Sequence, residues 1–225
     1  MGGIEAYLAR NGRPIPLQTN WEKLRFVSID LESTGLDPRR DSIVSMAGIG
    51  LVNSEIALWD QFSDMLPVRY NTASVTVHGI TREESITGTD ESTAVATFLE
   101  WMGDGVIVGH HIQHDLTLLN AALERHHGIL LRNVAVDTME SFLAVREAGG
   151  FAGRPAPRGF SLDSLCDHFE IAPHDRHTAS GDAYLTAQIF LRILKEAGKR
   201  GQWNLEDLHA WKASEPFPWN VGNSP

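Results

Sequence analysis

The order of short apolar runs along the chain constrains its fold more than any other feature. Strand-like runs come first, at residues 25–31, 42–52 and 57–68. The polar segment Asn53-Ser54-Glu55 between the second and third runs predicts a hairpin. From residue 91 onward, helix-like apolar spacing alternates with short strands. Because strands that alternate with helices are joined by parallel crossovers, the sequence predicts an α/β fold with a mixed central sheet flanked by helices.

The second half of the chain supplies the helices of this fold. Apolar residues recur with helical spacing most clearly at residues 91–101 and 182–197. Between them we expect a strand at 106–108, a helix around 112–123, a strand at 133–137, and helices at 138–147 and 162–169. Residues 81–86 read as a turn, and the glycine-rich segment 149–159 reads as a loop.

Composition indicates the class of protein, and the positions of proline and tryptophan indicate its segments. With 42% hydrophobic and 21% charged residues, the chain is typical of a globular protein and is neither collagen-like nor disordered. We expect residues 25–198 to form one domain, preceded by a leader at 1–24 in which Pro14 and Pro16 interrupt any long helix. The tail at 199–225 contains Trp203, Trp211 and Trp219, which we expect to pack on the domain or on a partner.

Location follows from cysteine content and hydropathy. The single cysteine, Cys166, cannot form an internal disulfide, which favours a reducing compartment. No apolar stretch approaches the roughly 18 residues of a membrane span, and the first 16 residues lack the apolar core of a signal peptide. The sequence therefore predicts a cytoplasmic protein with no membrane contact.

Acidic residues follow the expected strands at the points where sites form in α/β sheets. Asp30 and Glu32 end the first strand at positions i and i+2, so their carboxylates lie on one side of it. Asp115 and Asp182 stand in first turns of helices, and strand ends and helix starts converge at one sheet edge. Each acid alone is explained as a solvated strand end or a helix cap. Because clustered carboxylates repel one another and Mg²⁺ or Mn²⁺ prefers oxygen ligands, the four together with His177 predict a metal site.

Three segments carry a resemblance to a known family. They are Asp30-Leu31-Glu32-Ser33-Thr34-Gly35, Gly109-His110-His111-Ile112-Gln113-His114-Asp115 and His177-Thr178-Ala179-Ser180-Gly181-Asp182. In this order they resemble the three motifs of the DEDDh family of 3′-5′ exonucleases, which includes the exonuclease domain of the DNA polymerase III epsilon subunit and RNase T. Residues 77–81 and 136–138 are similar to segments of the epsilon-like branch. The resemblance spans residues 25–197 and implies a ribonuclease-H-like three-layer fold.

The resemblance also implies a mechanism. Four carboxylates would hold two divalent ions, Mg²⁺ or Mn²⁺, for hydrolysis of phosphodiester bonds. Asp30 would bridge both ions, Glu32 and Asp182 would complete the site of the attacking water, and Asp115 would support the second ion. His177 would be the general base, a task suited to imidazole near neutral pH. We therefore expect a 3′-5′ exonuclease that releases nucleoside 5′-monophosphates from single-stranded DNA or RNA 3′ ends.

Substrate contacts follow by the same resemblance. The residues that would border the terminal nucleotide are Leu31, Ser33, Thr34, His78 and His114. His114 stands where relatives usually have Phe, and its ring can still stack on a base. Arg154, Arg158 and Arg176 could bind backbone phosphates, although the first two fit a solvated loop equally well.

Several alternatives stay open from the sequence. His110, His111 and His114 could form a zinc site. The chain could instead be a non-catalytic nucleic-acid-binding protein on the same fold, or a proofreading subunit with a polymerase partner, and a homodimer is a further alternative. The net charge of −10 argues against a broad basic surface, so we expect weak, salt-sensitive binding of long nucleic acid, with affinity concentrated at the 3′ end.

Overall fold

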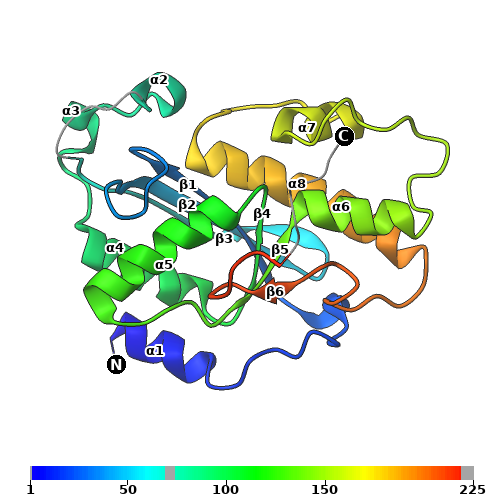
Figure 1. Ribbon diagram of the computed structural model, residues 1–225, viewed down its shortest axis with the longest axis horizontal. Helices are drawn as coiled ribbons and strands as arrows, with labels where there is room; N and C mark the ends of the chain where they lie inside the picture. Colours follow the sequence, from blue (N-terminus) through cyan, green and yellow to red (C-terminus); the bar gives the residue numbers. More distant parts are fainter. Residues whose placement is uncertain (1, 69–73, 219–225) are drawn as a thin grey trace.

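A mixed six-stranded sheet organises the protein (Figure 1). The computed structural model describes residues 2–68 and 74–218. The strands are β1 (Phe26–Ser33), β2 (Ile43–Val52), β3 (Glu55–Met65), β4 (Val106–Gly109), β5 (Val134–Asp137) and β6 (Trp211–Lys212). Their order is β3-β2-β1-β4-β5-β6. β1, β4 and β5 are parallel, whereas β2, β3 and β6 run antiparallel to their neighbours. The predicted mixed sheet and the β2–β3 hairpin are confirmed.

Helices cover both faces of this sheet (Figure 1). They are α1 (Gly3–Arg10), a 3-10 turn η1 (Trp21–Lys23), α2 (Val75–His78), α3 (Arg82–Ser85), α4 (Glu91–Met102), α5 (Gln113–His127), α6 (Thr138–Glu147), α7 (Leu162–Phe169) and α8 (Ala179–Gly198). Buried side chains of α4 and α5 form one core with β1, and α8 shares a second core with β4 and β5. Within the described part of the chain, none of these helices is long and apolar enough to cross a membrane.

The alternation of side chains along β1 separates the two cores. Ile29 and Leu31 pack in the core on the α4 and α5 side. Phe26 points the other way and meets Phe190 of α8 edge to face, with ring centroids 5.0 Å apart. Ser28 lies on this second side too, where its hydroxyl donates to the Ala183 carbonyl at 2.8 Å. Because the period of a strand is two residues, Asp30 and Glu32 share the side that faces α8.

Three α-helices, α1, α2 and α3, lie where the sequence pattern indicated none. Residues 81–86, expected as a turn, contain α3, which Thr81 and Glu84 cap reciprocally: each side chain accepts from the other residue's backbone N–H. This capping box is a sequence signal in its own right, since Thr and Glu stand three residues apart. In the leader, α1 ends at Arg10, before Pro14 and Pro16.

Leader and tail both pack on the sheet and its helices. Tyr7 of α1 is fully buried; its hydroxyl donates to Asn133 Oδ1 at 2.6 Å and accepts from the Arg132 N–H at 2.7 Å. Trp211 lies in β6 beside β5 and is 4% exposed, and Trp203 is partly buried. The expectation that the tail packs on the domain is thus confirmed for these two residues, whereas Trp219 lies outside the described residues. The division at residues 24 and 198 stays a prediction.

A bulge interrupts β3, which lies at the free edge of the sheet. Ile49 pairs with Gln61 and Gly50 pairs with Ala57, so residues 58–60 have no opposite residue in β2. Asp60 turns inward and binds Arg25 Nε at 2.8 Å. A Cβ on Gly50 would overlap the Asp60 carboxylate, so glycine is required there. The side chains of Leu58 and Trp59 project into solvent, 64% and 81% exposed.

Candidate metal and catalytic site

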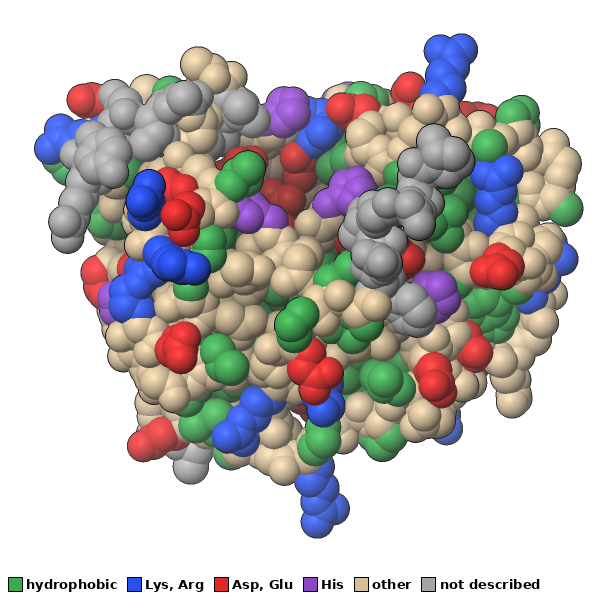
Figure 2. All heavy atoms as spheres, viewed as in Figure 1, with side chains coloured by type: hydrophobic (Ala, Val, Ile, Leu, Met, Phe, Trp, Pro, Cys, Tyr) green, Lys and Arg blue, Asp and Glu red, His purple; other side chains and the backbone are tan. Residues whose placement is uncertain are grey.

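The site begins where β1 extends beyond its neighbour β4. β4 pairs only with residues 26–28 of β1, so the following residues of β1 pair with β2 alone. Asp30 and Glu32 therefore lie at the open carboxyl end of the parallel strands, the region in which α/β sheets form sites. Figure 2 shows acidic side chains deep in a hollow near the upper edge of the molecule, with histidine side chains at its rim.

Three of the predicted acids converge at this end of the sheet. One carboxylate oxygen each from Asp30, Glu32 and Asp182 lie within 4.8 Å of one another. Asp182 reaches the strand from the first turn of α8, whose N-terminus is capped by the Thr178 hydroxyl accepting from the Gly181 N–H at 3.1 Å. Separations of this size suit oxygen ligands around one small divalent cation.

Asp115, the fourth acid, approaches from α5 and is tied to the same strand. Its Oδ1 accepts the Leu31 N–H at 2.9 Å, and the residue is 9% exposed. Asp137, at the end of β5, fixes the start of α5 by accepting the Ile112 N–H at 3.0 Å. Asp137 also caps α6, a role that its place between a strand and a helix signals in the sequence. Its contact with the start of α5 could not be inferred in that way.

Burial and mutual repulsion make the ionised acids unfavourable. Burial, reinforced by Asp115, Asp182 and Glu32, raises the pKa of Asp30 well above its usual range. Burial and the nearby Asp182 raise the pKa of Glu32 to about 7. Burial likewise raises the pKa of Asp115 to about 7, against the lowering effect of its hydrogen bond from Leu31. Such a cluster ionises fully only when positive charge is supplied.

Arg176 supplies one positive charge from the loop before α8. Its guanidinium forms an ion pair with the Asp182 carboxylate. On its other side it binds Asp163 of α7 with two hydrogen bonds, from Nε at 2.6 Å and Nη2 at 3.3 Å. The side chain is 19% exposed. The ion pair shows that Asp182 accepts a positive charge. The carboxylate oxygens of the cluster and their negative charge fit a divalent cation as well.

His177 directly follows Arg176 in the loop before α8, and its side chain is exposed. It has a positive φ of 61°, as has Asp175 at 53°, so the chain turns sharply just before α8. A Cβ on Gly181 would overlap the Asp175 carbonyl oxygen, so the loop depends on glycine at this position. The local backbone thus places the imidazole outside the carboxylate cluster but next to it in sequence.

Four of the predicted substrate residues have contacts that the structure describes. Leu31 is 7% exposed and packs in the core, with its backbone N–H bound to Asp115. His114 Nε2 is 3.5 Å from the Ser33 hydroxyl, and the Thr34 hydroxyl donates to Asp41 at 2.9 Å. The side chain of His78 lies outside the described residues.

The three histidines of the second motif do not gather into a metal site. His110 shares a 2.8 Å hydrogen bond with Thr138, and His111 bonds the Phe160 carbonyl at 3.0 Å. Burial lowers the pKa of His110 to about 3. Among residues 2–68 and 74–218, the acids of β1 and α8 form the only group of three or more potential ligands. The zinc alternative at these rings therefore has no support.

The fold and this site together define an α/β domain with an acidic cluster at the open end of its central strand. The sequence model of the RNase T exonuclease family matches residues 27–190, so the chain belongs to this exonuclease family.

Curated relatives with related sequences are DNA polymerase III proteins. The chain is 31% identical over 202 residues to the PolC-type DNA polymerase III of Latilactobacillus sakei. The aligned region covers 88% of this chain and 13% of that protein. The chain is 27% identical over 175 residues to the DNA polymerase III epsilon subunit of Aquifex aeolicus, covering 76% of this chain and 81% of the subunit. The chain thus spans only about one seventh of the PolC-type relatives.

Solved structures share the fold. E. coli exonuclease I in complex with a dT13 oligonucleotide matches with a TM-score of 0.64 and 17% identity, over 78% of this chain and 42% of that one. Exonuclease X in complex with 5′ overhanging duplex DNA matches with a TM-score of 0.59 and 20% identity, over 82% and 96%. The predicted ribonuclease-H-like fold is confirmed.

Proposed function

We propose that the protein is a metal-dependent 3′-5′ exonuclease that hydrolyses phosphodiester bonds at the 3′ ends of single-stranded nucleic acid and releases nucleoside 5′-monophosphates. The observation that carries the proposal is the convergence of Asp30, Glu32 and Asp182 within 4.8 Å in a chain of the exonuclease family. The intact set of acids argues against a non-catalytic binding protein on the same fold, because a binding role alone does not need buried carboxylates that repel one another.

The acids would hold two divalent ions, Mg²⁺ or Mn²⁺. Asp30, Glu32 and Asp182 would hold one ion, and Asp115 with Asp30 would hold the other; Asp115 is separate from the group of three but close enough to raise the pKa of Asp30. Such ions supply a water-derived nucleophile and stabilise charge on the phosphate and its leaving oxygen. The protein's part is to fix the carboxylates, which the Leu31 N–H and the α8 cap do here.

His177 would accept the proton of the attacking water. Its side chain is exposed, so it would be able to approach a phosphate that enters from solvent and to pass its proton on to bulk water. Arg176 binds α7 through Asp163 and thereby restrains the neighbouring loop residue. Arg176 would thus hold the loop in place while its neighbour His177 accepts the proton.

The terminal nucleotide would lie between the β1 end and the start of α5. Ser33 and Thr34 offer hydroxyls there, His114 offers a ring for stacking, and Leu31 and His78 complete the proposed border. A single strand suits a hollow site because its last base need not be unpaired first. The proposal covers single-stranded DNA and single-stranded RNA alike, and a contact to the 2′-hydroxyl would decide between them.

The direct test uses a 5′-labelled single-stranded oligonucleotide with Mn²⁺ or Mg²⁺. We expect shortening one nucleotide at a time, released mononucleotides, and full inhibition by EDTA. A control oligonucleotide of the same sequence, with a phosphorothioate linkage at its 3′ end, should resist degradation. This control distinguishes 3′-5′ from 5′-3′ digestion. If neither ion supports shortening while the protein remains folded, the proposal is wrong.

A proofreading role is the second candidate, and the DNA polymerase III relatives favour it. It predicts that a polymerase co-purifies with this chain and that mispaired 3′ ends are removed faster than paired ones.

Sedimentation of the purified protein tests the homodimer alternative. For the location we propose the cytoplasm, supported by the single cysteine, Cys166, which is buried and whose thiol pKa burial raises to about 11.

A further inference from the structure

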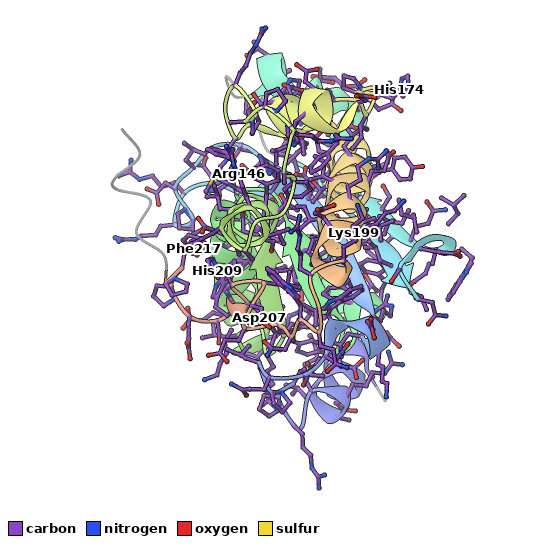
Figure 3. All side chains as sticks on the ribbon, turned by 90° about the vertical axis from the view of Figure 1, so that its right-hand side faces the viewer. Arg146, His174, Lys199, Asp207, His209 and Phe217 are labelled. Carbon is purple, nitrogen blue, oxygen red and sulfur yellow. The ribbon has the colours of Figure 1, made fainter. Side chains whose placement is uncertain are left out.

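A strongly basic pocket lies at the end of α8 opposite the acid cluster. It encloses about 440 Å³ between the second half of α8, the loop after α6 and the end of α7. Figure 3, which turns this side of the molecule toward the viewer, labels Lys199 beside α8. The charged residues that line the pocket are Arg154, Arg192, Lys195, Lys199, Arg200 and Glu196. Five of the chain's 19 Lys and Arg residues thus meet a single acid, in a protein whose net charge is −10.

Glu196 compensates only part of this charge. It accepts from Lys199 at 2.7 Å and from Arg200 at 3.2 Å. The hydrogen bonds of the other two arginines go to neutral carbonyls, from Arg192 to Gln188 at 3.1 Å and from Arg154 to His168 at 3.2 Å. Lys195 is exposed and forms no ion pair with any residue that the structure describes.

The dipole of α8 accounts for some of these cations but not for all. Positive charge in the last turn of a helix is favourable, which explains Lys195 and Lys199. The effect fades within one turn, whereas Arg192 stands earlier in α8 and Arg154 comes from a different segment. Phe151 and Phe169, whose ring centroids are 5.6 Å apart, form an apolar wall that strengthens interactions with an anion.

A second pocket of about 440 Å³ shows how a balanced basic site differs. It lies beside Thr34 and includes Arg40, Arg125 and His126. Arg125 and His126 both contact Glu91 at 2.7 Å, and Arg40 pairs with Asp37 at 3.6 Å. Each cation there has a carboxylate partner, so the uncompensated charge is a property of the α8 pocket.

We propose that the α8 pocket binds phosphate groups of the nucleic-acid backbone at a distance from the 3′ end. Asp182 and Lys195 are 13 residues apart on one helix, so the pocket lies roughly 20 Å from the acid cluster along α8. Even at the close phosphate spacing of a duplex strand that length is only about six intervals, so a single strand of 20 nucleotides is long enough to reach both sites. The inference rests on the proposed function only in naming nucleic acid as the polyanion. It departs from the sequence expectation that affinity is concentrated at the 3′ end.

The test compares two double variants with the same change of charge. Arg192→Glu with Lys195→Glu alters the pocket, and Arg13→Glu with Lys23→Glu alters exposed cations of the leader as a control. Fluorescence anisotropy in EDTA measures binding of 4-nucleotide and 20-nucleotide single strands without degradation. We expect the unaltered protein to bind the longer strand at least about tenfold more tightly, and the pocket variant to lose most of this gain. The slope of log affinity against log salt should fall by about 1.4 for two lost phosphate contacts.

Turnover of the 4-nucleotide strand with Mn²⁺ separates this proposal from the catalytic one. It should be unchanged in both double variants, because neither touches the acid cluster, and thermal unfolding confirms that both are folded. Equal binding of the long strand by the pocket variant and the unaltered protein would overturn the proposal, as would an equal loss in the control. Displacement of the 20-nucleotide strand from the unaltered protein by polyglutamate but not by polyphosphate would also overturn it, and would identify an acidic peptide as the occupant.

Discussion

The guanidinium of Arg176 forms an ion pair with the carboxylate of Asp182 while it is anchored to Asp163 on α7. It therefore compensates part of the negative charge of the acids, although the pKa values of Asp30 and Glu32 stay raised beside it. A divalent ion that binds Asp182 must compete with this arginine. The same contact connects the loop bearing His177 to the acid cluster.

Removing this competitor should increase metal affinity. In Arg176→Ala we expect Mn²⁺ to bind at least about tenfold more tightly, since a charge-assisted contact of about 1.5–3 kcal/mol no longer has to be broken. Titration calorimetry measures this, with Arg176→Lys as the variant that keeps the charge. Weaker binding in Arg176→Ala would show that the arginine organises the site and does not compete for it.

The stability of the metal-free protein should fall as pH rises. The pKa of Glu32 is about 7 in the folded chain against 4.5 ordinarily, so between these values the folded state binds more protons than the unfolded state. Its stabilising proton is lost as pH approaches 7. We expect the free energy of unfolding to decline from pH 5 to pH 8 by on the order of 1–2 kcal/mol more than in Glu32→Gln, allowing for solvent screening. Urea titrations in EDTA at both pH values measure the difference, and Mn²⁺ at pH 8 should restore stability.

Asp182→Asn should remove activity while the fold persists. Loss of an outer-shell partner lowers the activity of metal sites roughly 10- to 100-fold, so loss of a ligand should exceed that range. Asp104→Asn, at an exposed residue before the N-terminal end of β4 and so away from the carboxyl end where the acids lie, makes the same chemical change as a control. Initial rates on a single strand, with circular dichroism for folding, decide the matter; comparable rates in the two variants would remove Asp182 from the site.

His177→Ala should lower the rate by about 10²- to 10⁴-fold, the usual contribution of a general base. Metal affinity should stay nearly constant, because the imidazole lies outside the group of three acids. Rate profiles over pH 5–9 with calorimetric Mn²⁺ titrations separate the two properties. Equal losses of rate and of metal affinity would instead make His177 a ligand.

Tyr7→Phe should destabilise the protein without changing its activity. The variant leaves the Arg132 N–H and Asn133 Oδ1 without their partner in a fully buried position, which costs about 1–3 kcal/mol. Thermal and urea unfolding measure the loss. Tyr184→Phe on exposed α8 surface is the matched control and should leave stability within about 0.5 kcal/mol.

The sequence predicted the elements that depend on their own apolar period. The boundaries expected for α7 at 162–169 and α6 at 138–147 agree with the structure, because each begins with a capping residue and contains a clear apolar stripe. β6 was not predicted, since two residues of strand have no period and Trp211 pairs only because β5 presents its edge. α2 and α3 were missed because four-residue helices depend on caps more than on apolar spacing.

For the site, ordered motifs could be read from the sequence but charge balance could not. The motifs placed Asp30, Glu32 and Asp182 on the elements that bring them together. Arg176 was expected to bind phosphate, and only the folded chain shows it between Asp182 and Asp163. Four of the five cations of the α8 pocket lie at residues 192–200, where apolar residues and Glu196 separate them, and only the folded chain brings Arg154 to them.

The bulge at residues 58–60 has a consequence for self-association. A continuous edge strand offers a ladder of free N–H and C=O groups on which a second molecule can extend the sheet. In β3 that ladder is broken where Asp60 turns inward to Arg25, so a foreign strand would find correct register on either side of the break but not across it. The exposed Leu58 and Trp59 therefore lie on an edge strand whose bulge hinders amyloid-like stacking. Deleting residues 58–60 would make β3 continuous, and we expect the protein then to aggregate.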